Sequence, residues 1–165
     1  MKTIRKRGIA RIHSEKKFGY FRNVYVRIEN DCATYLDPQV TENEDAASQV
    51  QMEIYFDFWA TETSYEIKTN STEANSTVVV CRPKDYYGTE LSTMTARESF
   101  YLLPGFYTLH FYDSAGDGMG FGGGLANYTL SVMAAGSDNP NVVVTSIGDF
   151  GFVETTCFEV PETIT

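Results

Sequence analysis

Apolar and polar residues alternate along most of this chain with a period of two. Between residues 50 and 58, large apolar side chains occupy every second position, at Val50, Met52, Ile54, Phe56 and Phe58. This period is typical of a β-strand that buries one face and exposes the other. Several segments show this period or are rich in β-branched and aromatic residues, which favour strands. We predict strands at residues 24–28, 50–58, 65–68, 77–82, 99–103, 106–112, 125–133, 141–146 and 154–160.

Clusters of glycine, proline, asparagine, aspartate and serine separate the predicted strands. About eight or nine short strands with such turns indicate an all-β fold, an antiparallel β-sandwich or jelly roll. Helix is limited to short turns around residues 44–48 and 92–98. Pro104-Gly105 suits a tight turn, because proline fixes φ at the first corner and glycine accepts a positive φ at the second. We therefore predict a hairpin that joins strands 100–103 and 106–112.

The composition is that of one globular domain. The chain has 165 residues, of which 42% are hydrophobic and 14% aromatic, which excludes disorder of the whole chain. No apolar run approaches the length of a membrane span. The first residues lack the apolar centre of a secretory signal, so we expect any export signal to be missing from this chain.

Charge is distributed unevenly along the chain. The formal net charge is −9, from 13 basic and 22 acidic residues. Residues 1–27 contain nine basic residues and one acid, whereas residues 28–165 contain four basic residues and 21 acids.

We therefore divide the chain into a basic N-terminal arm, residues 1–19, and one β-sandwich domain, residues 20–165. Such an arm indicates a targeting segment, contact with an acidic partner or contact with its own acidic body, and a solvated tail is the alternative. The arm residues expected to bind a partner are Arg5, Lys6, Arg7 and Arg11.

Residues 113–124 combine six glycines with two aspartates. Asp113 and Asp117 resemble half of a calcium-binding loop, in which carboxylate and carbonyl oxygens converge on a hard cation. The EF-hand pattern is incomplete, because Ala115 occupies its third position and Gly124 its twelfth. A cation here would need ligands from a second loop, and a glycine-rich connection without a ligand is the alternative.

Three ordered motifs resemble those of a family of secreted β-sandwich modules. Residues 106–118, FYTLHFYDSAGDG, lead through a glycine stretch to NYTL at 127–130, similar to the family's "YDSxGDG" loop and the strand after it. Residues 148–158, GDFGFVETTCF, resemble its closing motif, and residues 57–65, DFWATETSY, resemble an upstream element that usually ends in ETSW. The resemblance covers about residues 51–160. It implies an extracellular repeat-type module of algal and marine-bacterial secreted proteins, often appended to enzymes or adhesins.

Many members of that family carry a cysteine pair after the GDG, where this chain has Met119-Gly120-Phe121. Met119 and Phe121 either pack beneath the loop, which we favour, or stand exposed as a contact for a partner.

The resemblance also points to a second acidic loop, in the upstream motif at residues 57–65. If strands 50–58 and 106–112 are neighbours, Asp57 and Glu62 face Asp113 and Asp117 at one end of the sandwich. Four crowded carboxylates repel one another without a cation, and oxygen ligands favour calcium over zinc. The alternative is a turn in which Glu62, Thr63 and Ser64 hydrogen-bond to the backbone.

The cysteines and glycosylation motifs bear on the compartment. Three cysteines allow at most one intrachain disulfide. Because terminal strands often pair in sandwiches, we predict a Cys32–Cys157 bridge, and three buried thiols are the alternative. The pattern for N-glycosylation occurs three times and modestly supports an exported protein. The acceptor residues are Asn70, Asn75 and Asn127.

The sequence does not predict an enzyme. Neither His13 nor His110 has neighbours that suggest a nucleophile and a base, and no G-x-S-x-G motif occurs. We expect a non-catalytic extracellular or surface module, stabilised by calcium, that contacts protein subunits or glycans through its loop end. Trp59 is expected to pack in the core rather than to stack on a sugar. The alternative is a subunit of a shell, filament or virus-like coat whose basic arm binds nucleic acid or an acidic neighbour.

Overall fold

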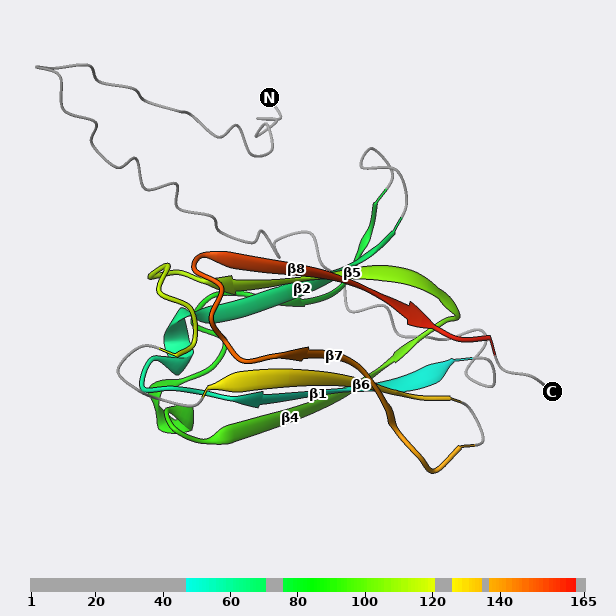
Figure 1. The fold of residues 1–165 in the computed structure, drawn as a ribbon, viewed down its shortest axis with the longest axis horizontal. Coiled ribbons are helices and arrows are strands. Elements are labelled where there is room, and N and C mark those ends of the chain that lie inside the picture. Colours follow the sequence, from blue (N-terminus) through cyan, green and yellow to red (C-terminus); the bar gives the residue numbers. More distant parts are fainter. Residues whose placement is uncertain (1–46, 71–75, 121–125, 135–136, 163–165) are drawn as a thin grey trace, which may run out of the picture.

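Two four-stranded antiparallel sheets form the fold (Figure 1). The structure is a computed structural model and describes residues 47–70, 76–120, 126–134 and 137–162. The sheets have the strand orders β4-β1-β6-β7 and β3-β2-β5-β8. The strands are β1 (Ser48–Tyr55), β2 (Thr63–Thr69), β3 (Val78–Arg82), β4 (Thr95–Leu102), β5 (Gly105–Asp113), β6 (Asn127–Met133), β7 (Asn141–Ser146) and β8 (Val153–Val160). The predicted all-β antiparallel fold is confirmed.

The core lies between the inner faces of the two sheets. In β1, Val50, Met52 and Ile54 are buried and alternate with the exposed residues Gln51 and Glu53. Alternating side chains point to opposite faces of a strand, so the period of two identified the buried face correctly. Each predicted strand within the described residues is present, with ends that differ by a few positions. Strand 24–28 and the arm, residues 1–19, lie outside the described residues.

Two short helical turns, both 3₁₀, accompany the strands: η3 (Ala60–Glu62) and η4 (Thr89–Leu91). The helical turn predicted at residues 92–98 is wrong, because residues from Thr95 onward form β4 and pair with β1. No helix in the described parts of the chain is long and apolar enough to cross a membrane.

The hairpin predicted at Pro104-Gly105 is also wrong. Strands β4 and β5, which flank this dipeptide, belong to different sheets. β4 pairs with β1, whereas β5 pairs with β2 and β8. The dipeptide therefore carries the chain across the sandwich instead of turning it back within one sheet.

The predicted Cys32–Cys157 bridge is wrong as well. Cys157 has a free, exposed thiol, whereas Cys81 on β3 takes part in a disulfide. Sulfur pairing follows the approach of the two backbones in space, which the sequence separation of cysteines does not reveal.

Three aromatic rings stack across the core. The rings of Tyr65 on β2 and Phe111 on β5 are nearly parallel, with centroids 5.9 Å apart. Phe111 also stacks on Tyr128 of β6, in the opposite sheet, at 4.1 Å. Parallel rings add attraction beyond the burial of apolar area. The stack therefore joins the two sheets through the middle of the molecule.

Each end of this stack carries a hydroxyl that donates to a glutamate of the opposite sheet. Tyr65 Oη donates to Glu98 on β4 at 3.2 Å, and Tyr128 Oη donates to Glu154 on β8 at 2.6 Å. Burial, together with the neighbouring carboxylate, raises the pKa of both tyrosines well above the usual value. Both hydroxyls therefore stay protonated and can donate at any physiological pH.

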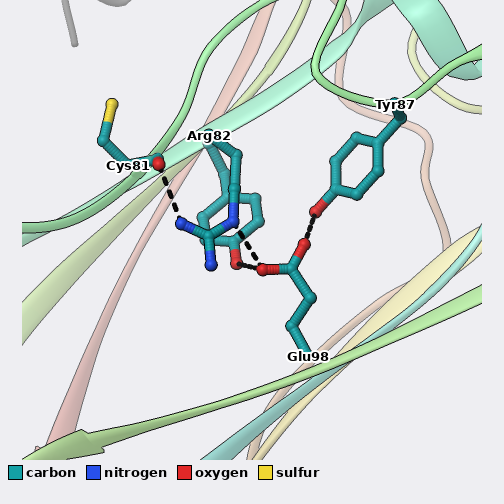
Figure 2. A network of polar contacts seen from close by, with 5 residues as sticks. Cys81, Arg82, Tyr87 and Glu98 are labelled. Carbon is teal, nitrogen blue, oxygen red and sulfur yellow. Dashed lines mark hydrogen bonds and ion pairs between the residues drawn. The ribbon is translucent and has the colours of Figure 1, made fainter. Parts of the chain in front are cut away.

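Glu98 accepts two further hydrogen bonds, shown in Figure 2. Arg82 Nε at the end of β3 donates to its Oε2 at 2.5 Å, and Tyr87 Oη donates to its Oε1. Arg82 also donates through Nη1 to the carbonyl of Cys81 at 3.0 Å. The side chains of Arg82 and Glu98 are only 20% and 14% exposed. Because three partners satisfy it, the Glu98 carboxylate is tolerated on the inner face of an edge strand.

The Glu98 network leads to the first prediction. Glu98→Gln should lower the free energy of unfolding by about 3 kcal/mol, because it removes the carboxylate charge that pairs with the largely buried guanidinium of Arg82. Urea unfolding followed by circular dichroism measures this change.

A matched control is Glu53→Gln. Glu53 also pairs with an arginine, Arg97, at 2.6 Å, but these side chains are 52% and 74% exposed. Water and salt screen such a pair, so its loss should change stability little. Equal effects of the two substitutions would contradict a structural role for the buried network.

Candidate functional site

Four chain connections meet at one end of the two sheets (Figure 1), which we call the loop end. They are residues 56–62 between β1 and β2, residues 83–94 between β3 and β4, residues 114–120 after β5, and residues 147–152 between β7 and β8. All three sequence motifs contribute to this end.

Asp113, the last residue of β5, holds the Gly/Asp-rich loop together. Its Oδ2 accepts hydrogen bonds from the backbone N–H groups of Gly116, Asp117 and Gly118 at 2.8–2.9 Å. Its Oδ1 accepts a fourth, from Ala115 at 3.2 Å. The side chain is 97% buried within this ring of donors, since its exposed fraction is 3%. The first aspartate of the motif therefore stabilises its own loop, a role that the sequence analysis missed.

Glycine is required where this loop meets the closing motif. Gly118 has a φ of +73°, and a Cβ there would lie 2.4 Å from the carbonyl oxygen of Gly148. The adjacent N–H of Met119 donates to that same oxygen at 2.8 Å. Only glycine combines this backbone conformation with so close an approach. The loop after β5 and the β7–β8 turn are thus packed backbone against backbone.

Three of the four predicted metal ligands converge. Glu62, Asp113 and Asp117 each offer a carboxylate oxygen, and these oxygens lie within 4.8 Å of one another. Glu62 is half-buried, Asp113 is buried and Asp117 is exposed. The fourth, Asp57, is close enough for its charge to raise the pKa of Glu62 and for the charge of Asp117 to raise its own pKa. The structure therefore brings three of these residues together and places Asp57 near them at the loop end.

The predicted reason for this convergence is wrong. β1 and β5 are not neighbours, because they belong to different sheets. Glu62 approaches Asp113 because β2 pairs with β5 and places Thr63 opposite Asp113. The N–H of Ser114 also donates to the carbonyl of Glu62 at 3.1 Å. Asp57 joins from the end of β1, across the gap between the sheets.

Burial and mutual repulsion make these carboxyls hold protons more readily. Burial, reinforced by the neighbouring Asp117 carboxyl, raises the pKa of Asp113 to about 6. Burial raises the pKa of Glu62 as well, and the charges of Asp113 and Asp117 raise it further. The pKa of Asp57 is raised chiefly by burial. The charge of Lys84 partly offsets this effect at Glu62. Protons or a bound cation would neutralise the remaining repulsion among the carboxylates.

The geometry of the cluster fits a hard cation. Calcium takes oxygen ligands at 2.3–2.6 Å, so two oxygens on opposite sides of the ion lie about 5 Å apart. The separation of at most 4.8 Å among the three carboxylate oxygens is compatible with that distance. The Asp113 carboxyl also hydrogen-bonds with the side chain of Asp117, so these two groups already lie in direct contact.

The structure places the remaining predicted residues as follows. Met119 is buried in the core, with 2% of its surface exposed, so it packs beneath the loop, the alternative that we favoured, and does not stand exposed for a partner. Asn70 and Asn127 are exposed, as a glycan would require. Residues outside the described ranges are Phe121, Asn75 and the arm residues Arg5, Lys6, Arg7 and Arg11.

The sequence analysis missed a group of exposed apolar side chains at the loop end. Phe58, Trp59, Tyr86 and Met94 are each more than half exposed, and we call them the end patch. The expected burial of Trp59 is wrong, because β1 ends at Tyr55 and the chain turns into η3. In this turn the N–H of Trp59 donates to Asp57 Oδ1 at 2.8 Å. The period of two continues through Phe58, so the sequence pattern gave no signal of this exposure.

The raised pKa values give a second prediction. A carboxyl whose pKa is higher in the folded chain than in the unfolded chain, where it is about 4, favours folding at low pH and opposes it as the pH rises through the folded value. Asp117→Asn removes one repelling charge. Without divalent cations, the variant and the parent should be equally stable near pH 4, and the variant should become the more stable one as the pH rises through about 6, the pKa of Asp113.

Urea titrations in a chelator at several pH values measure this difference. The matched control is Asp138→Asn, which neutralises an exposed carboxylate in the β6–β7 connection at the opposite end of the sheets. Its stability should follow that of the parent at each pH. A difference between parent and Asp117→Asn that does not change with pH would contradict the repulsion.

Comparison with known proteins identifies no relative of this chain. No protein-family model matches it, and neither the curated proteins nor the solved structures include a significant match. The family resemblance of the three motifs therefore stays a prediction, and the function has to be argued from the geometry of this chain.

Proposed function

We propose that this protein is a non-catalytic extracellular or surface module, structural or binding, whose loop end is stabilised by calcium. The observation that carries this proposal is the convergence of Glu62, Asp113 and Asp117, with carboxylate oxygens within 4.8 Å. Three carboxylates at that distance oppose folding at neutral pH unless a positive charge lies between them.

Calcium fits this role better than other common metals. The candidate ligands are all carboxylate oxygens, which suit calcium, magnesium and manganese rather than zinc or copper. Magnesium requires near-ideal octahedral geometry at shorter distances, whereas calcium tolerates irregular ligand sets. Glu62, Asp113 and Asp117 would hold the ion, and Asp57 would add negative charge beside it. Bound there, the ion would neutralise the cluster and tie the β1–β2 turn to the loop after β5.

Two observations support an extracellular or surface location. Cys81 takes part in a disulfide, and disulfides form and persist mainly in oxidising compartments. Asn70 and Asn127, two of the three glycosylation motifs, have exposed side chains. Calcium sites of extracellular modules bind weakly, with dissociation constants of about 0.1–1 mM, which a partly exposed site of few protein ligands would match.

The non-catalytic part of the proposal rests on the surroundings of His110. This residue lies on the outer face of β5, because its neighbours Leu109 and Phe111 point into the core. Its Nδ1 is 3.1 Å from Thr155 Oγ1, and burial lowers its pKa. The ring thus lies beside a threonine hydroxyl on the outer face of the sheet, where the charges of Lys68 and Glu66 also act on it.

Thermal unfolding with and without calcium tests the proposal. At calcium concentrations about 100-fold above the dissociation constant, binding adds about 2.7 kcal/mol, or roughly 8 °C in Tm for a domain of this size. Asp117→Asn should remove most of the increase, because it deletes an exposed ligand and leaves the buried Asp113 carboxylate with its backbone donors. Asp138→Asn should keep it.

The same experiment with magnesium at the same concentration distinguishes a specific calcium site from general screening of the negative charge by divalent cations. A site with irregular oxygen ligands should raise Tm less with magnesium than with calcium. A parent chain with the same Tm in calcium, magnesium and chelator at pH 7 would end the calcium proposal.

A further inference from the structure

The end patch exposes more apolar surface than a solvated loop region needs. The exposed fractions are 60% for Phe58, 55% for Trp59, 52% for Tyr86 and 54% for Met94. Single exposed apolar residues are ordinary, but a group of them on a folded domain marks an interaction surface.

Backbone contacts hold the segments of the patch together. Ser92 Oγ donates to the carbonyl of Phe58 at 2.9 Å, and the N–H of Phe56 donates to the carbonyl of Met94 at 3.0 Å. The N–H of Asp85, the neighbour of Tyr86, donates to the carbonyl of Thr61 at 3.2 Å. The four residues therefore lie on chain segments that are held side by side at the loop end.

This surface is strongly negative. The described residues of the four loop-end connections, with Asp113 at their border, include seven carboxylates against one lysine, Lys84. Lys68, Arg82 and Arg97 pair with glutamates that are not among these seven. The seven are Asp57, Glu62, Asp85, Glu90, Asp113, Asp117 and Asp149.

A partner for this surface must combine positive charge with groups that pack on aromatic rings, and arginine does both. The structure already contains one such contact, since the guanidinium of Arg82 lies 5.0 Å from the centre of the Tyr86 ring. The chain itself supplies a segment of this chemistry outside the described residues. Residues 1–19 contain seven basic residues, three of them arginines, and one acid.

We propose that the end patch docks the basic N-terminal arm, residues 1–19, of the same polypeptide. Charge complementarity draws the arm to the loop end, and stacking on Trp59 and its neighbours fixes it there. The four apolar side chains of the end patch are not members of the cluster of Glu62, Asp113 and Asp117, so packing of the arm on them does not require calcium. A calcium ion in that cluster would weaken docking only by lowering the negative charge nearby.

The chain offers a specific optical probe, because Trp59 is its single tryptophan. The acceptor is the full-length chain with Arg5, Lys6, Arg7 and Arg11 changed to alanine, which leaves every described residue intact. A synthetic peptide of residues 1–19, which contains no tryptophan or tyrosine, is titrated into it in chelator at low salt. We expect a saturable change in Trp59 emission that weakens severalfold as salt is raised.

Two matched pairs make the experiment decisive. A peptide with the same four alanines should bind at least about tenfold more weakly, because it loses most of its charge. In the acceptor, Phe58→Ser should weaken binding about fivefold or more, whereas Val142→Ser, which alters an equally exposed apolar residue on β7, should leave it unchanged.

Three results would overturn the proposal: Trp59 emission that does not respond to the peptide at low salt, equal weakening by Phe58→Ser and Val142→Ser, or equal binding of the two peptides. A concentration-dependent dimer that the four-alanine chain keeps would also overturn it. Such a dimer would show that the patch pairs with a second copy of itself rather than with the arm.

Discussion

Two hydrogen bonds that run in opposite directions between the sheets determine how the layers lie on each other. Tyr65 donates from one sheet to Glu98 of the other, and Tyr128 donates in return to Glu154. Apolar burial is not directional and by itself would tolerate small shifts of one sheet over the other. A tyrosine hydroxyl that must hydrogen-bond a carboxylate between the sheets tolerates few such shifts, because a hydrogen bond forms only within a narrow range of distances and angles. The ring of Phe111, stacked between the two tyrosines, carries this constraint through the core.

The geometry of the loop end follows from the same arrangement. Pairing of β2 with β5 sets Glu62 beside Asp113, while the position of one sheet over the other brings Asp57 to the same place. The acidic cluster therefore draws on both layers. A change in the offset of the sheets would separate its members, although none of them belongs to the hydrophobic core.

The sequence predicted the positions of the strands better than it predicted which strands pair. Alternation of Val50, Met52 and Ile54 depends on local geometry alone, so the strands and their buried faces could be identified. Which strands pair depends on contacts distant in sequence, and Pro104-Gly105 can serve either a hairpin or a crossing between sheets. The motifs correctly grouped the acidic residues, although the predicted pairing of β1 with β5 was wrong. Glu98 could not be assigned to the interior, because its partners Tyr65 and Tyr87 come from other strands and loops.

The hydrogen bonds around Asp113 have a consequence for how the loop end would respond to an ion. Four backbone N–H groups of the loop already close on this carboxylate without any metal. Binding to a preorganised loop costs little conformational entropy, so an ion arriving there would tighten an existing shape rather than create one. The module would then keep its fold when calcium is scarce and change mainly in stiffness. Metal-dependent domains such as zinc fingers behave differently, because they unfold when the ion leaves.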